Sequence, residues 1–134
     1  MDKQEFIKKI EIELKISKNS EYTLRNYLRA NNTLLDFVNK DPDQLTEDDV
    51  KMFMAENLSD KAASSIILFL AAIKYSYLSI LKKDITSSIK RPKKERRIPT
   101  VLSKEEVKKL FGAIISTKSK LMVSLMYACG FRVS

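Results

Sequence analysis

The side chains with the clearest capacity for chemistry are basic, and they are concentrated in one part of the chain. Residues 1–80 carry 11 Lys and Arg against 13 Asp and Glu, whereas residues 81–134 carry 14 against 4. Eight of the basic residues fall between positions 82 and 97. Guanidinium and ammonium groups bind phosphates, so this excess predicts a polyanionic partner, either nucleic acid or an anionic membrane surface.

Other reactive side chains are scarce. The sequence has no histidine, which excludes His-based acid–base chemistry and most zinc sites. Cys129 is the single cysteine, so no disulfide can form within the chain, which fits a reducing compartment. Tyr27, Tyr75, Tyr77 and Tyr127 lie in helical patterns and are predicted to line the core or a groove. We expect no metal and no cofactor.

The N-terminus and the apolar runs give no targeting or membrane signal. The N-terminus alternates charged and apolar residues, unlike a signal peptide. The longest apolar stretch, residues 66–73, is shorter than the roughly 18 residues of a membrane span. A cytoplasmic protein without a membrane partner is therefore predicted.

The elements that must position these groups are predicted to be helices, because 2 Gly and 3 Pro are too few for the turns of an all-β fold. Four helices precede the basic region. Their predicted bounds are residues 3–16, then Ser20 to Asp41-Pro42, then a short helix after Thr46, then Ser59 or Asp60 to about Lys83. The last of these is apolar nearly all round, which is typical of the central helix of a bundle.

The second helix has two contrasting faces. Its predicted inward stripe is Leu24, Tyr27, Leu28, Leu35 and Val38. Asn31 falls on that stripe, so either the helix bends there or Asn31 has a buried partner. The opposite, wetter face carries Tyr22, Arg25, Asn26, Arg29, Asn32 and Asp36.

The composition changes after the fourth helix. Residues 84–102 are basic and contain two prolines, so they are predicted to form an exposed linker at a domain boundary. Ser103 and Glu106 form a capping box that starts a fifth helix. A sixth, largely buried helix is predicted over residues 120–129. Gly130 then stands where a helix end often needs a positive φ.

Several segments resemble the tyrosine recombinase, or phage integrase, family and its Xer-like members. Arg96-Arg97-Ile98-Pro99 followed by Leu102-Ser103-Lys104-Glu105-Glu106-Val107 is similar to the start of the family's catalytic domain. Tyr127-Ala128-Cys129-Gly130-Phe131-Arg132-Val133-Ser134 is similar to the segment that contains its first catalytic arginine. Ser20-x-x-Thr23-x-x-x-Tyr27 resembles the opening of its core-binding domain. Thr86-Ser87-Ser88 departs from the Asn-Pro that the family often has in this region.

The resemblance implies an all-α fold in three parts. A four-helix, SAM-like core-binding bundle would span residues 1–83, a basic interdomain linker residues 84–102, and the first two helices of a truncated catalytic domain residues 103–134. Such enzymes cleave and rejoin DNA through a 3′-phosphotyrosyl link. Arg132 would be the first arginine to form bidentate hydrogen bonds to the scissile phosphate as charge develops on it. The other catalytic residues would lie beyond Ser134, so this chain alone is expected not to cleave DNA.

The family places its second and fourth helices against the major groove, and its linker crosses the duplex. The implied DNA-binding residues are Arg25, Asn26, Arg29, Lys61, Lys74, Lys82, Lys83, Lys90, Arg91, Lys93, Lys94, Arg96 and Arg97. Because residues 1–80 carry a net charge of −2, the linker is expected to supply much of the affinity. It would do so by neutralising phosphates and releasing their counterions.

Three functions remain open on the sequence. The chain is a fragment of a recombinase, a non-catalytic protein that occupies DNA sites without cutting them, or a helical interaction module with a basic tail. Double-stranded DNA is the expected partner in the first two cases. Association with other protomers is also expected, through the apolar faces of the last two helices.

Overall fold

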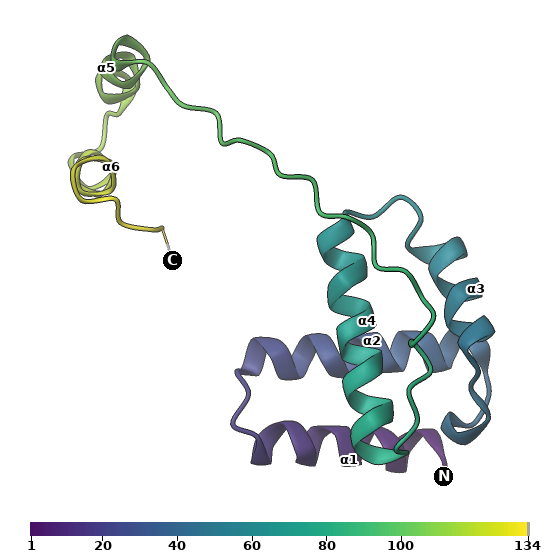
Figure 1. The fold of residues 1–134 in the computed structure, drawn as a ribbon. Helices are drawn as coiled ribbons and strands as arrows, with labels where there is room; N and C mark the ends of the chain where they lie inside the picture. The colour runs from purple at the N-terminus through teal and green to yellow at the C-terminus, as the bar shows by residue number, and fades with distance from the viewer. Residues whose placement is uncertain (134) are drawn as a thin grey trace. The chain divides into compact units, whose positions relative to one another are not determined.

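The computed structural model describes residues 1–133, and these contain helices but no strand (Figure 1). The elements are α1 (Lys3–Ile16), α2 (Glu21–Val38), a 3-10 turn η1 (Pro42–Gln44), α3 (Glu47–Asn57), α4 (Ala63–Ile80), α5 (Lys104–Ala113) and α6 (Thr117–Cys129). The predicted all-α fold is confirmed. The chain divides into two compact units, Met1–Glu95 and Arg96–Ser134.

Side-chain caps fix where α2 and α3 begin. The Ser20 hydroxyl accepts a hydrogen bond from the Thr23 N–H at 3.2 Å. Thr46 and Asp49 form a capping box, in which the Asp49 carboxylate accepts from the Thr46 N–H at 2.9 Å. Both predicted N-caps are confirmed. A capping side chain lies within three residues of the N–H group that it satisfies, so a sequence pattern can reveal it.

Two predicted helix ends are wrong, and left-handed backbone explains both. α2 ends at Val38, three residues before the predicted stop at Asp41-Pro42, because Asn39 adopts a φ of 52°. α4 ends at Ile80 rather than near Lys83, because Lys82 adopts a φ of 55°. Neither residue is the glycine that usually occupies such a position.

The predicted start of α4 is also wrong. The Lys61 N–H donates to the Leu58 carbonyl at 3.1 Å, which closes a turn through Ser59 and Asp60. α4 therefore begins later, and Ala62 takes the N-cap position without a side-chain hydrogen bond.

The core of the first unit forms where α4 crosses α1 and α2, which lie side by side (Figure 1). Its buried apolar side chains are Phe6, Ile10 and Leu14 of α1, Leu34 and Leu35 of α2, Val50 and Phe53 of α3, and Phe69, Leu70, Ile73 and Tyr77 of α4. α4 contributes more buried side chains than the other helices, as expected of a central helix.

The apolar stretch of α4 is longer than the run 66–73, because it extends over the whole helix. Its 18 residues have a mean hydropathy of 1.5, which meets the length and composition of a membrane-crossing helix. The central helix of a bundle can meet the same criterion, because neighbouring helices bury its apolar side chains, and 33% of this helix is buried. In this chain α1 and α2 both pack against α4.

Asn31 finds a buried partner, which was one of the two outcomes expected for it. Its side chain is fully buried, and Nδ2 donates to the Ser76 hydroxyl at 2.8 Å and to the Tyr27 carbonyl at 2.9 Å. Ser76 in turn donates to the Ala72 carbonyl at 2.9 Å. This directional contact fixes the rotation of α2 against α4. Apolar packing alone would specify that rotation less narrowly.

The segment after α4 folds back onto the first unit (Figure 1). We call residues 81–89 the strap. Ile85 of the strap is 2% exposed and belongs to the core, and Thr86 is buried beside it. The predicted exposure of the linker is therefore wrong at Ile85 and Thr86, because the apolar side chain of Ile85 completes the bundle, whereas Ser87 and Ser88 are exposed as predicted.

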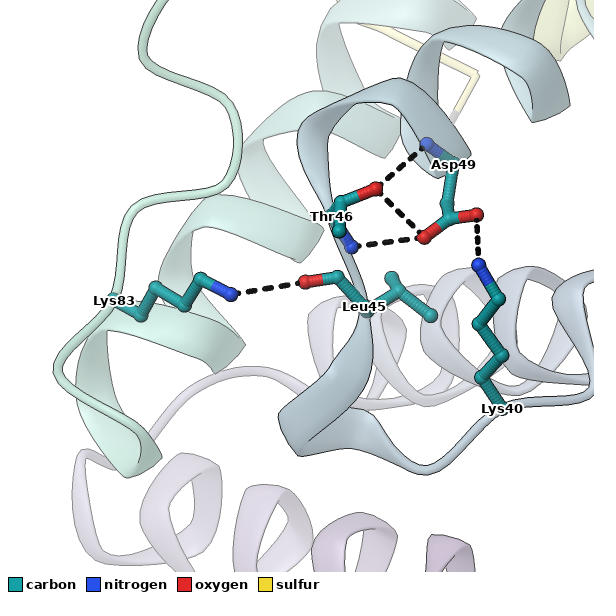
Figure 2. A network of polar contacts seen from close by, with 5 residues as sticks. All are labelled: Lys40, Leu45, Thr46, Asp49 and Lys83. Atoms are coloured by element: carbon teal, nitrogen blue, oxygen red, sulfur yellow. Dashed lines mark hydrogen bonds and ion pairs between the residues drawn. The ribbon is translucent and has the colours of Figure 1, made fainter.

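Polar contacts tie the strap to elements far away in the sequence. The Lys83 ammonium donates to the Leu45 carbonyl at 3.1 Å, immediately before the Thr46–Asp49 capping box (Figure 2). Lys40 forms an ion pair with Asp49 at 2.7 Å on the other side of the same box (Figure 2). The loop that starts α3 is thus held from both sides.

In the second unit the capping box and the positive φ are confirmed, but the predicted start of α6 and the predicted burial are wrong. Ser103 and Glu106 form the expected capping box, and Gly130 adopts a φ of 67°. α6 begins at Thr117 rather than at residue 120. Of the described residues in α5 and α6, none is buried, although Phe111 and Tyr127 make an edge contact at 6.1 Å. Two short helices cannot enclose each other's apolar side chains.

We expect Ser76→Ala to destabilise the first unit by about 1–2 kcal/mol, because it leaves the buried Nδ2 of Asn31 with one partner fewer. Chemical denaturation followed by circular dichroism measures this change in the free energy of unfolding. Ser79→Ala, in the same helix, removes a hydroxyl that makes no hydrogen bond within residues 1–133 and is the matched control. Equal stability of the two variants contradicts the prediction.

Candidate nucleic-acid interface

A cleft of about 350 Å³ opens between α2, α3 and α4. It is lined by Asn26, Arg29, Ala30, Thr33, Phe53, Leu58, Lys61, Ser65, Leu68 and Phe69. We call it the α2–α4 cleft. Three of the predicted site residues, Asn26, Arg29 and Lys61, meet there. The sequence did not single out Ser65 and Thr33, although each lies four residues beyond a predicted cation.

The two cations of the cleft differ from six other lysines of the first unit, which pair with carboxylates. Within residues 1–133, Arg29 and Lys61 make no side-chain hydrogen bond or ion pair, and no carboxylate lines the cleft. The lysines that do pair with carboxylates are Lys3, Lys9, Lys15, Lys40, Lys51 and Lys74. A cleft with two uncompensated cations and hydroxyl groups is suited to an anionic ligand such as a phosphate.

Asn26 adds an unused donor to this cleft. Its Nδ2 atom is buried and has no hydrogen-bond partner within the described chain. Buried polar groups are normally paired, because an unmet donor costs free energy. Arg25, one residue earlier, does not line the cleft; its guanidinium lies 5.9 Å from the centre of the Tyr22 ring.

Three other predicted DNA-binding lysines already have partners inside the first unit. Lys74 forms an ion pair with Asp84 at 2.8 Å, and helical periodicity puts it roughly 120° around α4 from Leu68. Lys82 donates to the Ser79 carbonyl at 2.9 Å, and Lys83 donates to Leu45 (Figure 2). The structure does not bring these lysines to the α2–α4 cleft. Each partner except Ser79 lies ten or more residues away, which a sequence pattern does not reveal.

The densest positive charge follows the strap. We call residues 90–97 the basic segment. Its cations are exposed, and they are Lys90, Arg91, Lys93, Lys94, Arg96 and Arg97. This stretch has no regular secondary structure, since Pro92 lies within it and Pro99 follows it. Extended, solvated cations can follow the phosphates of a polyanion without a fixed groove.

Arg132 belongs to the second unit. It lines an apolar cleft of about 240 Å³ with Met122, Leu125, Met126, Phe131 and Val133. Its side chain is exposed. The positive φ of Gly130 ends α6 two residues earlier, so Arg132 extends from a helix end, as the sequence suggested.

The Asp84 carboxylate has the most perturbed pKa among the acids of the strap region. The Lys74 ammonium and the Thr86 hydroxyl and N–H lower its pKa from 3.8 to about 2. At Asp49 burial opposes ionisation, but hydrogen bonds from Lys40 and Thr46 outweigh it and lower the pKa. Both carboxylates therefore remain ionised where they hold the strap and the α3 loop.

Comparisons with known proteins show what this chain is similar to. A sequence family described as "Phage integrase, N-terminal SAM-like domain" matches residues 6–87, a range that ends within the strap. The chain is 31% identical to tyrosine recombinase XerC of Anoxybacillus flavithermus, over 90% of the chain and 46% of that protein. It is also 31% identical to tyrosine recombinase XerD of Oceanobacillus iheyensis, over 86% and 44% respectively.

A solved structure gives a similar result. The crystal structure of XerA recombinase matches 96% of this chain and 47% of its own, with a TM-score of 0.56 and 25% identity. The chain thus spans about half the length of the proteins that it resembles.

We expect the stability that Asp84 contributes to disappear in acid. Its folded-state pKa is depressed, so the contribution is present above about pH 4 and is lost as the pH falls through about 2. Asp84→Asn should melt at a lower temperature than the unaltered protein at pH 6, and the two melting temperatures should converge near pH 2. A constant difference in melting temperature from pH 6 to pH 2 contradicts this assignment. Glu13→Gln, which alters an exposed carboxylate of α1, is the control.

Proposed function

This chain belongs to the phage integrase, or tyrosine recombinase, family, and we propose that it is the DNA-binding portion of a site-specific recombinase. The observation that carries the proposal is the family match over residues 6–87 followed directly by the exposed basic segment. The parent enzyme would break and rejoin DNA strands through a phosphotyrosyl intermediate, as its resemblance to tyrosine recombinases implies.

Two surfaces would share the binding of duplex DNA. Arg29 and Lys61 of the α2–α4 cleft are free to contact backbone phosphates, and Asn26 lines the same cleft. The basic segment would contact phosphates alone. Such contacts raise affinity for any sequence, release counterions and make binding strongly dependent on salt.

The domain organisation follows from the same proposal. The core-binding domain would comprise residues 1–83 together with the strap, whose Ile85 completes its core. The remaining linker, up to residue 102, would connect it to the start of the catalytic domain at residues 103–134. In that domain Arg132 would stabilise the charge that develops on the scissile phosphate, since a guanidinium can donate two parallel hydrogen bonds to it.

Contact between protomers is a further part of the proposal. Large apolar side chains of α5 and α6 are exposed, among them Leu121, Met122 and Tyr127. Exposed apolar side chains of this kind favour association with other protein surfaces. Other protomers of the same recombinase would supply such surfaces when several bind neighbouring DNA sites.

We expect charge reversal of the basic segment to abolish most DNA binding. In a gel-shift titration over a salt series, Lys93, Lys94, Arg96 and Arg97→Glu together should weaken binding at low salt at least about tenfold. The slope of log K against log salt should shrink by about 0.9 for each phosphate that the variant no longer neutralises. A control with the same net charge reverses Lys8, Lys18, Lys118 and Lys120, all exposed. Unchanged low-salt binding by the first variant refutes the role of the segment.

We expect the α2–α4 cleft to contribute separately. Arg29→Ala and Lys61→Ala should each weaken duplex binding several-fold and reduce the salt slope by about 1, because each removes one phosphate-binding cation. Lys18→Ala removes an exposed cation outside the cleft and should bind as the unaltered chain does. Equal binding by all three variants removes the cleft from the interface.

A further inference from the structure

The strap is anchored to the first unit at four successive places. Lys83 donates to Leu45 of the loop before α3 (Figure 2). Asp84 Oδ2 pairs with Lys74 of α4 at 2.8 Å, and Ile85 lies in the core. Ser88 donates to the carboxylate of Glu47 at the start of α3. Anchors on several different elements hold these residues more firmly than a surface loop.

Asp84 is the residue that organises the middle of the strap. Its Oδ1 accepts hydrogen bonds from the Thr86 N–H at 2.9 Å and from the Thr86 hydroxyl at 2.7 Å. Its other oxygen pairs with Lys74. One side chain therefore closes a local turn and joins that turn to α4, with Ile85 turned into the core between the two contacts.

The anchored region ends where the basic segment begins. Ile89 is partly buried against the core, and Lys90 is exposed. With the strap docked, Lys93 is four residues beyond an anchored position. With the strap released, the last anchored residue would be Ile80, and Lys93 would be thirteen residues beyond it.

We propose that the strap positions the basic segment on DNA, with Asp84 and Lys74 as positioning residues rather than DNA contacts. This inference rests on the proposed DNA binding. A charged segment on a short tether has a higher effective concentration at the neighbouring phosphates than the same segment on a long one. Lengthening the free tether from four residues to thirteen lowers that concentration by about sixfold, if it scales with the −3/2 power of length. Docking thus raises affinity without an additional contact to DNA.

Docking of the strap explains why Lys74 and Lys83 do not face the α2–α4 cleft. Lys74 and Lys83 carry positive charge that the sequence assigned to phosphate binding, yet each is bound to a protein acceptor. Neutralising Lys74 should therefore weaken DNA binding through release of the strap. The reduction in salt slope should be smaller than for Lys61, because Lys74 itself neutralises no phosphate.

A double-mutant cycle with the full chain tests the proposal. Asp84→Ala is measured for duplex binding in the unaltered chain and in a chain with Lys93, Lys94, Arg96 and Arg97→Ala. We expect binding to weaken more than twofold and up to about sixfold in the first background, and less than twofold in the second, since the second has little charge left to position. Glu13→Ala, which removes an exposed carboxylate from α1, should change neither.

Equal weakening in both backgrounds, or no weakening in either, overturns the positioning role, because a general destabilisation would act on both alike. If the unaltered chain binds no duplex, the proposed function fails, and the inference fails with it.

Limited trypsin digestion reads out strap docking without DNA. Cleavage after Lys83, followed by mass spectrometry, should be several-fold faster in Asp84→Ala than in the unaltered chain. Asp84→Asn retains an oxygen that can accept from Thr86 but loses the ion pair with Lys74, so its cleavage rate should lie between the two. Identical cleavage rates in the three chains overturn the docking that the inference requires.

Discussion

The packing of α4 against α1 and α2 is the constraint from which the rest of the first unit follows. One side of α4 is buried with Tyr77 and Ile73, and the Asn31–Ser76 hydrogen bond sets how the helix is rotated. With that rotation fixed, Ser65 and Leu68 line the cleft, while Lys74 faces the strap. A single helix therefore helps to form the cleft that holds the free cations and also provides the anchor of the strap.

The sequence revealed those parts of the fold that depend on near neighbours. The caps at Ser20, Thr46 and Ser103 were predicted correctly, because a cap and its target lie three residues apart. The ends at Asn39 and Lys82 were missed because both residues adopt a left-handed conformation, which asparagine adopts more readily than lysine. The late start of α4 was missed for a similar reason, since a backbone turn displaces the side chains that could have capped it.

The same distinction applies to the candidate site. Asn26 and Arg29 could be grouped from helical spacing, and Lys61 joined them through an expected family geometry. Charge alone could not separate Lys61 from Lys74, because the difference lies in Asp84, which packs beside α4 only after the chain has turned back. A net charge of −2 over residues 1–80 similarly did not show that Arg29 and Lys61 share one cleft without a carboxylate, while six of the other lysines there pair with carboxylates.

The burial of Ile85 also bears on where the first unit could be cut or joined to another protein. A boundary drawn at the last residue of α4 would leave a hole in the core where Ile85 packs, and the exchange of such a unit between relatives would create a cavity. A unit that keeps this core would be the four helices plus the strap, and a chimeric protein joined after residue 89 would retain Ile85 in its place. Evolutionary shuffling of DNA-recognition units in proteins of this kind would be under the same restriction.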